Sequence, residues 1–421
     1  MKVLLLGSGG REYIFCHQLA KSPHQPKLFI APGNAGTSQF GTNLELSITD
    51  FKGIKQAVLA YHIEMVIVGP EAPLVEGIVD FFAFDQDLAH IPVIGPSKQG
   101  AKLEGSKEFA KAFMQRHNIP TADYKSFTKD NLEEGLYYLE SLFPPYVLKA
   151  DGLASGKGVV ILNQLSEAKE ELVAMLAGEK FGEASQKVVI EEFLDGIEMS
   201  CFVLTDGKSY KILPMAKDYK RIGEGDTGLN TGGMGAVSPV PFVDEDFFQK
   251  VKDQVVEPTM RGLKQDGIPY VGFVFIGLIK VGENPKVIEY NVRMGDPETQ
   301  VVLPRIQNDF FELLQATATG NLENIKMSID KRYVSTIVAV SGGYPEHYEK
   351  GKVIRGIDSD DFVVHAGTAM VDKELVTRGG RVLSATGVGS DHKEAIEQSY
   401  QVLAKIDFQG IYYRKDIGFD L

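Results

Sequence analysis

The sequence predicts a multidomain protein that combines an α/β part with α+β parts. Three observations support this class. A chain of 421 residues is too long for one ordinary hydrophobic core, so more than one domain is expected. Up to about residue 100, short apolar runs that end in glycine or proline alternate with helix-like segments. After about residue 330 the pattern changes to strands joined by glycine turns.

The composition is that of a folded globular protein, because hydrophobic residues make up 43% and charged residues 24% of the chain. The net charge of −13 argues against a nucleic-acid surface, which usually carries a basic excess. Cys16 and Cys201 fit no metal or redox spacing, so buried thiols in a reducing cytoplasm are expected. The N-terminal apolar run ends at Gly7, too early for a signal sequence, and no run of about 18 apolar residues follows. We therefore expect a cytoplasmic protein that binds neither nucleic acid nor a membrane.

The first part of the chain predicts a parallel sheet built from βαβ units. It opens with the strand KVLLL, the turn GSGG and a helix over residues 11–21, and further buried strands follow in KLFIAPG, MVIVGPEAP and IPVIGP. Ligands of such sheets bind at the carboxyl ends of the strands. The functional loops are therefore expected at that edge.

Two glycine loops at this edge form the first candidate ligand site. GSGGRE, residues 7–12, fails as a dinucleotide fingerprint because Glu12 stands at the third glycine position, and KLFIAPG ends without an acidic residue to hold a ribose. NAD binding is therefore disfavoured. The backbone N–H groups of GSGG and of APGNAGT, residues 31–37, suit one phosphate. The alternative is that both loops are only tight turns.

Two further regions follow. Residues 97–118 have the pattern of one helical stretch that ends in the HNIP turn, and a second α/β domain starts near residue 105, with a new strand at YVLKADG. Beyond about residue 330, the strands STIVAVSGGYP, FVVHAGTA and GGRVLSATGVG and a helix over residues 391–406 predict a small α+β domain.

The segment DGLASGKG, residues 151–158, resembles a phosphate-binding P-loop without matching it. Asp151 stands where the pattern needs its first glycine, and Gly158 where it needs a hydroxyl. If phosphates bind here, Lys149 at the preceding strand end directs a charge at them, and the glycines form a mobile cover. The alternatives are that Lys149 is a surface residue and that Lys157 only keeps the loop solvated.

The strand VVIEEFL, residues 188–194, carries carboxylates where a purely structural strand prefers apolar side chains. Its end offers backbone N–H and C=O groups to an adenine edge, with Glu198 placed to reach ribose hydroxyls. A solvated strand end is the alternative.

The strand PKVIEYNVRM gives the strongest site prediction from residue types alone. Alternation places Glu289, Asn291 and Arg293 on one face and Tyr290 and Val292 on the other. Carboxylate and amide oxygens suit Mg²⁺, which takes one or two protein ligands and completes its shell with water and nucleotide phosphates. Arg293 is suited to a two-pronged grip on a carboxylate or phosphate. The alternative, a solvent-facing strand with a chance ion pair, is disfavoured by the polar segment MGDPETQ that follows.

Taken together, these residues resemble the ATP-grasp ligases and, within them, the glycinamide ribonucleotide synthetase family (phosphoribosylamine–glycine ligases). The resemblance covers nearly the whole chain. Its motifs occur in the order GSGGRE, APGNAGT, VGPEAPLVEGIVD, LEGSK, KADGLASGKGV, VIEEFLDGIE, NTGGMGA, KVIEYNVRMGDPETQ, SGGYP, HAGT, GGRVL and YRKDIG. GDPETQ and NTGGMGA are the specific ones, whereas the lysine, Glu-Glu and Glu-x-Asn elements alone indicate only ATP-grasp.

The resemblance implies three domains. They are an N-terminal α/β substrate-binding domain over residues 1–104, an ATP-grasp domain pair over 105–325 with a mobile lid at about 122–187, and an α+β C-terminal domain over 326–421. ATP would lie between the lid and the central domain.

The resemblance also implies a role for each candidate residue. ATP would be bound by residues that meet its phosphates, adenine and ribose: Lys107, Lys149, Lys157, Glu191, Glu192, Phe193, Leu194 and Glu198. Mg²⁺, or Mn²⁺ in its place, would be held by Glu289 and Asn291. The two substrates would be bound by the N-terminal glycine loops, by the KDYKR segment, and by Arg293 with the residues that follow it. These residues are Gly9, Gly10, Asn34, Asp218, Lys220, Arg221, Arg293, Gly295 and Asp296. Lys149 and Arg293 would be the catalytic residues.

The implied reaction ligates glycine to 5-phosphoribosylamine through glycyl phosphate, giving glycinamide ribonucleotide, ADP and phosphate in de novo purine biosynthesis. It needs no enzyme nucleophile, which agrees with the absence of a convincing Ser/His/Asp or Cys/His set; positioning and charge neutralisation supply most of the catalysis. A monomer with small-molecule partners is expected. One alternative is another ATP-grasp carboxylate–amine ligase with a different substrate pair, against which GDPETQ and the N-terminal loops argue. The others are an oxidoreductase and a non-catalytic nucleotide-binding protein.

The chain departs from the family pattern at several positions. Tyr13 and Tyr219 stand where the family commonly has histidine, and Leu229 replaces the proline of GPNTGGMG. Many ATP-grasp enzymes also carry an acidic metal ligand on the strand before Glu-x-Asn, whereas VGFVFIGLI has none.

Overall fold

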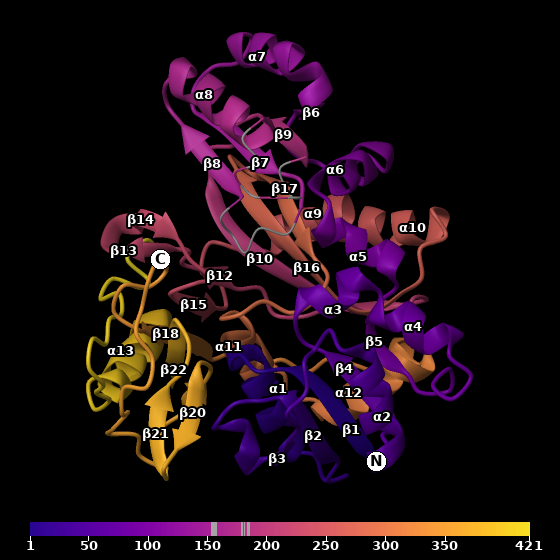
Figure 1. Ribbon diagram of the computed structural model, residues 1–421, viewed down its shortest axis with the longest axis vertical. Coiled ribbons are helices and arrows are strands. Elements are labelled where there is room, and N and C mark those ends of the chain that lie inside the picture. Colours follow the sequence, from indigo (N-terminus) through magenta and orange to yellow (C-terminus); the bar gives the residue numbers. More distant parts are fainter. Residues whose placement is uncertain (153–157, 178–179, 181, 183–185) are drawn as a thin grey trace.

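The computed structural model describes residues 1–152, 158–177, 180, 182 and 186–421. One long mixed sheet organises the molecule (Figure 1). Its nine strands are β1 (Lys2–Gly7), β2 (Lys27–Pro32), β3 (Gly41–Asn43), β4 (Met65–Val68), β5 (Val93–Pro96), β10 (Ile197–Thr205), β11 (Tyr210–Ile212), β16 (Tyr270–Val281) and β17 (Asn284–Asn291). They run in the order β11-β10-β16-β5-β4-β1-β2-β3. The strand β17 lies off this path and pairs with residues 275–281 of β16.

The N-terminal half of this sheet is parallel, as the sequence predicts, because β1 to β5 pair with one another in parallel. Its strands are buried on both faces: Leu4 and Leu6 belong to one hydrophobic core, while Val3 and Leu5 belong to another. The helices of this half are α1 (Gly10–Ala20), α2 (Phe51–Tyr61), α3 (Glu71–Glu76), α4 (Ile78–Phe84) and α5 (Lys98–Gly105).

The strand β16 joins the N-terminal half to the rest of the sheet. Its first residues, Tyr270 and Val271, pair antiparallel with Pro96 and Gly95 of β5. The remainder of β16 pairs antiparallel with β10 on one side and β17 on the other. The carboxyl ends of the parallel strands are thereby brought to the strand that carries the Glu-x-Asn motif.

The single helical stretch predicted over residues 97–118 is wrong in one respect, because the chain forms two helices there. The second is α6 (Lys107–Arg116), and Ser106 separates it from α5. Ser106 has an extended backbone, and its Oγ accepts a hydrogen bond from the N–H of Phe109 at 3.1 Å. A serine in this position starts a new helix, since it satisfies an N–H group that the helix leaves free.

A second, smaller sheet projects from the molecule at the top of Figure 1 and is called the lid sheet below. Its strands and the two helices packed against it are β6 (Tyr124–Thr128), β9 (Lys187–Glu191), β7 (Tyr146–Ala150), β8 (Val159–Leu162), α7 (Leu132–Glu140) and α8 (Leu165–Leu176). The strand order is β6-β9-β7-β8, and all the pairs are antiparallel. Its own core includes Leu139, Leu148, Leu172 and Ile190, so the lid sheet folds around a separate centre.

The C-terminal sheet takes strands from two parts of the chain. It runs β12 (Lys217–Asp218), β15 (Gly235–Ser238), β18 (Tyr333–Val340), β22 (Arg381–Gly389) and β19 (Val363–His365), with α13 (His392–Leu403) packed on β18 and β22. Two hairpins lie beside it: β13 (Arg221–Gly223) with β14 (Thr227–Asn230), and β20 (Thr368–Val371) with β21 (Glu374–Thr377). β12 and β15 belong to the predicted 105–325 domain in the sequence, but they pair within the C-terminal sheet. The domain boundaries therefore stay a prediction.

The remaining helices lie against the nine-stranded sheet and the C-terminal sheet. They are α9 (Glu245–Val251), which continues through the π-helical turn η5 (Lys252–Val256) into α10 (Glu257–Gln265), α11 (Thr299–Val302) and α12 (Phe310–Thr319). Short 3-10 turns occur at η1 (Thr37–Gln39), η2 (Lys129–Asn131), η4 (Glu224–Asp226), η6 (Leu303–Arg305) and η7 (Leu322–Asn324). Within the described residues, no helix has the length and apolar character needed to cross a membrane.

Candidate active site

The polar face predicted on β17 exists, and a β-bulge makes it. The pairing of β17 with β16 shifts by one residue at Ile288. Val287 and Tyr290 are therefore both buried, at 0% and 2% exposure, while Glu289 and Asn291 lie half-buried on the other face. A bulge resets the alternation of side chains, so the apolar half of the strand keeps its core contacts and the oxygen ligands stay accessible.

The carboxylate of Glu289 lies in the field of three lysines. Burial alone raises its pKa, but the charges of Lys220, Lys149 and Lys107 outweigh this and hold the pKa below its ordinary value. Glu289 is therefore ionised at neutral pH, the form that binds a cation. Asn291 completes a pair of oxygen donors, and its Oδ1 also accepts a hydrogen bond from Nη2 of Arg293 at 3.1 Å.

The neighbouring strand β16 has a glycine where a second carboxylate would face Glu289. Gly277 pairs directly with Glu289, and a Cβ atom at Gly277 would lie 3.1 Å from Cγ of Glu289. A side chain at position 277 would therefore crowd Glu289.

Arg293 is held between two glutamates that the sequence analysis did not assign to the site. Its Nη2 lies 2.6 Å from Oε1 of Glu104, and its Nε lies 3.3 Å from Oε2 of Glu71. The other oxygen of Glu104 accepts a hydrogen bond from the N–H of Val292 at 2.8 Å. Burial raises the pKa of Glu104 to about 7, although the charge of Arg293 opposes the shift. The guanidinium is therefore fixed in direction beside the polar face of β17.

The two predicted phosphate lysines lie at the junction with the lid sheet. Lys149, at the end of β7, forms an ion pair of 2.9 Å with Oε2 of Glu191, and Lys111 of α6 reaches the same oxygen at 3.0 Å. Lys107 begins α6, and its Nζ donates to the carbonyl of Gly152 at 3.3 Å. Lys111 was missed by sequence reasoning, since a lysine inside an amphipathic helix gives no local signal of burial.

In the segment predicted to meet adenine, residues 191–194, some side chains are exposed and others are buried. The Glu191 side chain is 4% exposed and is taken up by the two lysines, and the residue pairs with Tyr124 and Val147 within the lid sheet. Glu192 and Phe193 are exposed, and Leu194 is half-buried. Lys157, the further predicted phosphate contact, lies outside the described residues.

The KDYKR segment splits into a site face and a core face. Nζ of Lys220 lies 2.9 Å from Oε2 of Glu198, and the charge of Lys220 lowers the pKa of that carboxyl. Burial raises the pKa of the neighbouring Asp218. Tyr219 points the other way: it is 1% exposed, and its hydroxyl donates to Oδ1 of Asp420 at 2.8 Å. The tyrosine that replaces the family's histidine here therefore packs in the C-terminal core.

Arg221 and Leu229 belong to the hairpin next to this segment. Nη1 of Arg221 donates to the carbonyl of Gly228 at 2.9 Å, and Leu229 is 50% exposed. The contacts of this hairpin with phosphoribosylamine stay a prediction.

The GSGGRE and GDPETQ motifs are packed directly against each other. A Cβ atom at Gly10 would lie 2.4 Å from Nε2 of Gln300, and one at Gly9 would lie 2.8 Å from Oδ2 of Asp296. The N–H of Arg11 donates to Oδ2 of Asp296 at 3.3 Å, and Gln300 donates to Oδ1 at 2.8 Å. A side chain at position 9 or 10 would therefore displace the side-chain end of Asp296 or Gln300.

Arg381, from the GGRVL motif, extends this contact to the C-terminal sheet. Its Nη1 donates to the carbonyl of Gly232 at 2.6 Å and to the carbonyl of Asp296, and lies 3.5 Å from Oδ1 of Asp296. The motifs GSGGRE, GDPETQ and GGRVL, which are far apart in the sequence, thus meet at Asp296. NTGGMGA joins them through the hydrogen bond between Gly232 and Arg381. This contact, through Gly9, Gly10, Asp296 and Arg381, is called the motif junction below.

Replacing Arg381 with methionine should lower the free energy of unfolding by about 2 kcal/mol, because hydrogen bonds from a charged donor are lost. Urea unfolding monitored by circular dichroism measures this. Arg378→Met is the matched control, since Arg378 is exposed at the start of the same turn. Equal midpoints for the two variants would contradict a stabilising role for Arg381.

Asn34 lies at the motif junction's outer side and has no free side-chain group in this structure. Its amide nitrogen donates to the carbonyls of Ser8 at 2.9 Å and His365 at 3.0 Å, and its Oδ1 accepts from the N–H groups of Gly36 and Thr37. A direct contact of this side chain with a substrate would require one of these bonds to break.

Tyr13, the other residue that departs from the family pattern, also lies at a contact with the C-terminal sheet. Its ring stacks on His365 at 5.7 Å between centroids and meets the edge of Phe40. Burial raises its pKa to about 12. The hydroxyl therefore stays protonated at neutral pH.

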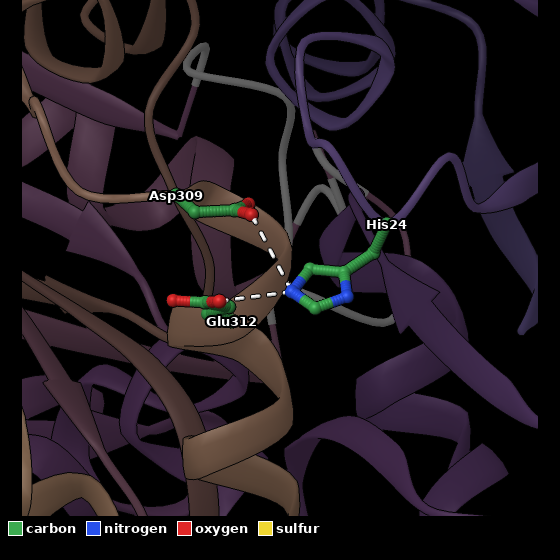
Figure 2. A group of neighbouring side chains, drawn as sticks. All are labelled: His24, Asp309 and Glu312. Carbon is green, nitrogen blue, oxygen red and sulfur yellow. Dashed lines mark hydrogen bonds and ion pairs between the residues drawn. The ribbon is translucent and has the colours of Figure 1, made fainter.

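One further cluster of metal-type ligands occurs among the described residues and does not involve β17. Figure 2 shows His24 facing Glu312 and Asp309, with its Nε2 2.8 Å from Oε1 of Glu312 and 4.0 Å from Oδ2 of Asp309. Both oxygens of Asp309 have protein partners, because Oδ1 caps α12 through the N–H of Phe311 and Oδ2 accepts from Ser22. The cluster is explained as a capped helix start paired with a histidine.

Comparison with known proteins agrees with this geometry. The sequence patterns of the phosphoribosylglycinamide synthetase N domain, ATP-grasp (A) domain and C domain match residues 1–104, 105–299 and 334–420. Phosphoribosylamine–glycine ligases from Caldanaerobacter subterraneus and Vibrio cholerae are 43% and 46% identical to this chain. The matches cover 99% and 100% of this chain and 99% and 98% of the relatives. The crystal structure of phosphoribosylamine–glycine ligase from Thermotoga maritima superimposes with a TM-score of 0.86 at 35% identity, over 99% of this chain and 100% of that one.

The lid sheet, the central sheet and the lysine and Glu-x-Asn residues between them define an ATP-grasp enzyme, a class that uses ATP together with a divalent cation. A biotin carboxylase domain from Hydrogenobacter thermophilus, solved with MgADP, shares this fold with a TM-score of 0.75 at 16% identity, over 98% of this chain and 91% of that one. Within the class, the chain belongs to the phosphoribosylglycinamide synthetase family.

Proposed function

We propose that this chain ligates glycine to 5-phosphoribosylamine, with ATP cleaved to ADP and phosphate. The observation that carries the proposal is the convergence of Lys107, Lys149, Lys220 and Arg293 on the ionised Glu289. Such a group of cations is suited to a polyphosphate and a carboxylate bound side by side. The relatives named above carry this activity in their names.

The nucleotide would lie between the lid sheet and β17. Lys107, Lys149 and Lys157 would contact the phosphates, the backbone of residues 191–194 would meet the adenine edge, and Glu198 would accept hydrogen bonds from the ribose hydroxyls. The ion pair of Glu198 with Lys220 supports this position, since it holds the carboxylate beside the site.

The donor set at β17 fits a hard divalent cation. Glu289 and Asn291 present two oxygens on one half-buried face, and Glu289 is ionised. We propose that these residues hold Mg²⁺, or Mn²⁺ in its place. When bound, the ion neutralises phosphate charge and orients the phosphate oxygens.

The two other substrates would lie on either side of the γ-phosphate. Arg293 would bind the carboxylate of glycine through Nη1, which here makes one long hydrogen bond of 3.4 Å to the carbonyl of Met294, helped by Gly295 and Asp296. Phosphoribosylamine would be bound by the loops and the segment that flank the motif junction: Gly9, Gly10, Asn34, Asp218, Lys220 and Arg221.

The chemistry then needs no protein nucleophile. A carboxylate oxygen of glycine attacks the γ-phosphorus, the bond to ADP breaks, and glycyl phosphate forms. The amine nitrogen of phosphoribosylamine attacks the carbonyl carbon, and phosphate leaves as the amide forms and the nitrogen loses a proton. Lys149 and Arg293 offset the negative charge of the transferred group, and the lid sheet excludes water from the acyl phosphate. We propose that this takes place in the cytoplasm and that the enzyme acts as a monomer.

Omission assays test this function. With ATP, Mg²⁺, glycine and freshly prepared phosphoribosylamine, the protein should release ADP, and leaving out any one component should reduce the rate to background. Each substrate is also exchanged, with alanine replacing glycine and ammonia replacing phosphoribosylamine. ADP release that ignores the amine, or that accepts alanine as well as glycine, would favour an ATP-grasp ligase with another substrate pair.

A further inference from the structure

One buried lysine joins both ends of the lid sheet to the central part of the protein. Lys111 of α6 is 2% exposed. Its Nζ donates to Oγ1 of Thr121 at 2.8 Å and to the carbonyl of Ala122 at 3.4 Å, where the chain enters the lid sheet. It also lies 3.0 Å from Oε2 of Glu191, the last residue of β9, where the chain leaves it.

Thr121, where the chain enters the lid sheet, is itself bound to β17. Oγ1 of Thr121 donates to the carbonyl of Val287 at 2.6 Å, and the two residues form a parallel bridge. Lys111 therefore lies where α6, both crossings of the lid sheet and β17 meet.

The carboxylate of Glu191 is shared by two cations. Lys111 and Lys149 contact the same oxygen, at 3.0 Å and 2.9 Å, and all three side chains are at least nine-tenths buried. One negative charge is divided between two ammonium groups that repel each other. Burial lowers the pKa of Lys111 to about 8, while the nearby charge of Glu191 opposes the shift.

Lys111 has all its donors engaged within the protein, whereas in the described part of the chain Lys149 is held by a single ion pair. The three acceptors around Lys111 match the three hydrogens of an ammonium group. Among the described residues, Lys149 forms one ion pair, and its amine is also close enough to Glu289 to lower the pKa of that carboxyl. The two lysines therefore have different tasks despite sharing one partner.

We propose that Lys111 is a positioning residue for ATP: by competing for the oxygen of Glu191, it weakens the hold of Glu191 on Lys149, so that Lys149 turns to the nucleotide phosphates. Glu191 then remains paired with Lys111, and the lid crossings keep their connection. This inference rests on the proposed contact of Lys149 with ATP. It concerns nucleotide binding alone, so its test does not require the glycine or phosphoribosylamine assignments.

The test is the affinity for ATP with Mg²⁺, measured by isothermal titration calorimetry without glycine and phosphoribosylamine. In Lys111→Met, Glu191 pairs with Lys149 alone, and the Kd should rise at least about tenfold, a coupling typical of residues in one charged network. In the Lys111→Met/Glu191→Gln double variant the competing carboxylate is gone. Its Kd should return to within about threefold of that of Glu191→Gln alone.

Two controls separate this role from a structural one. Lys111→Gln keeps N–H donors for Thr121 and Ala122 but removes the charge. It replaces Lys111→Met in the test if the methionine variant is poorly folded, and it should show the same loss of affinity for ATP. Lys264→Met removes an exposed lysine from α10 and should leave the Kd unchanged.

Three results would overturn the proposal. One is an unchanged Kd in the folded Lys111 variants, which would leave this lysine with a structural role only. Another is a loss of affinity that is equally large in the Glu191→Gln background, which would make Lys111 a direct ligand of ATP. The third is a Kd for ATP that is higher in the Lys111→Met/Glu191→Gln double variant than in Lys111→Met, since the carboxylate of Glu191 would then assist binding.

Discussion

Replacing Glu289 with alanine is expected to reduce ligase turnover by at least about a hundredfold while the protein stays folded. The carboxylate is the ionised oxygen donor on a face that three lysines surround, and its removal leaves only the amide oxygen of Asn291 for a cation. Folding should persist because Glu289 faces away from the core, which Val287 and Tyr290 fill. Turnover is measured as ADP release over a range of Mg²⁺ and Mn²⁺ concentrations, with circular dichroism as the check on folding.

The matched control for this variant lies in the same hairpin. Glu283 is an exposed residue of the turn between β16 and β17, and Glu283→Ala should keep full turnover. ATP binding without a divalent cation gives a second readout. Because Glu289 is a negative charge among lysines, Glu289→Ala should bind metal-free ATP at least as well as the unchanged protein does. Full turnover in Glu289→Ala would remove the metal role from this residue.

The architecture was predictable from the sequence where local patterns decide it. The parallel N-terminal sheet follows from buried strands that end in glycine or proline, and the structure confirms it. The continuation of this sheet through β16 was not predicted. A pairing between Gly95 and Val271 depends on how the chain returns after 176 residues, and local periodicity does not contain that information.

The polar face of β17 shows how a correct prediction of side-chain direction can rest on an incomplete pattern. Strict alternation over β17 would place Val287 on the same face as Glu289, whereas the structure buries Val287. The bulge at Ile288 makes the difference, and it arises from the pairing with β16 rather than from β17 itself. Glu289 and Asn291 were predicted correctly as a pair because both follow the bulge.

The acidic partners of Arg293 were the part of the site that was hardest to predict from the sequence. Glu71 and Glu104 stand in the VGPEAP and LEGSK motifs, which the sequence analysis noted without giving either residue a role. Their contact with Arg293 joins parts of the chain separated by 222 and 189 residues. A motif indicates that a residue matters, but only the fold shows which charge it meets.

Replacing Arg293 with methionine is expected to have the largest effect on stability, about 3–5 kcal/mol in the free energy of unfolding, because one partner of a buried ion pair is removed. The side chain of Glu104 is 6% exposed and would be left with the N–H of Val292 as its remaining partner in the described geometry. Turnover should be lost as well, since the proposed seat for the glycine carboxylate disappears. Urea unfolding measures the first effect and ADP release the second.

A second substitution separates the two roles of Arg293. Adding Glu104→Gln to Arg293→Met replaces the buried carboxyl with a neutral amide. Without Arg293, that carboxyl either stays charged and unpaired or takes up a proton, and both cost free energy. The double variant should therefore regain much of the lost stability and none of the lost turnover. Activity that returned together with stability would show that Arg293 serves only to neutralise Glu104. An inactive but stable double variant would assign the guanidinium to the substrate, since nothing else about the charge of the site would then be missing.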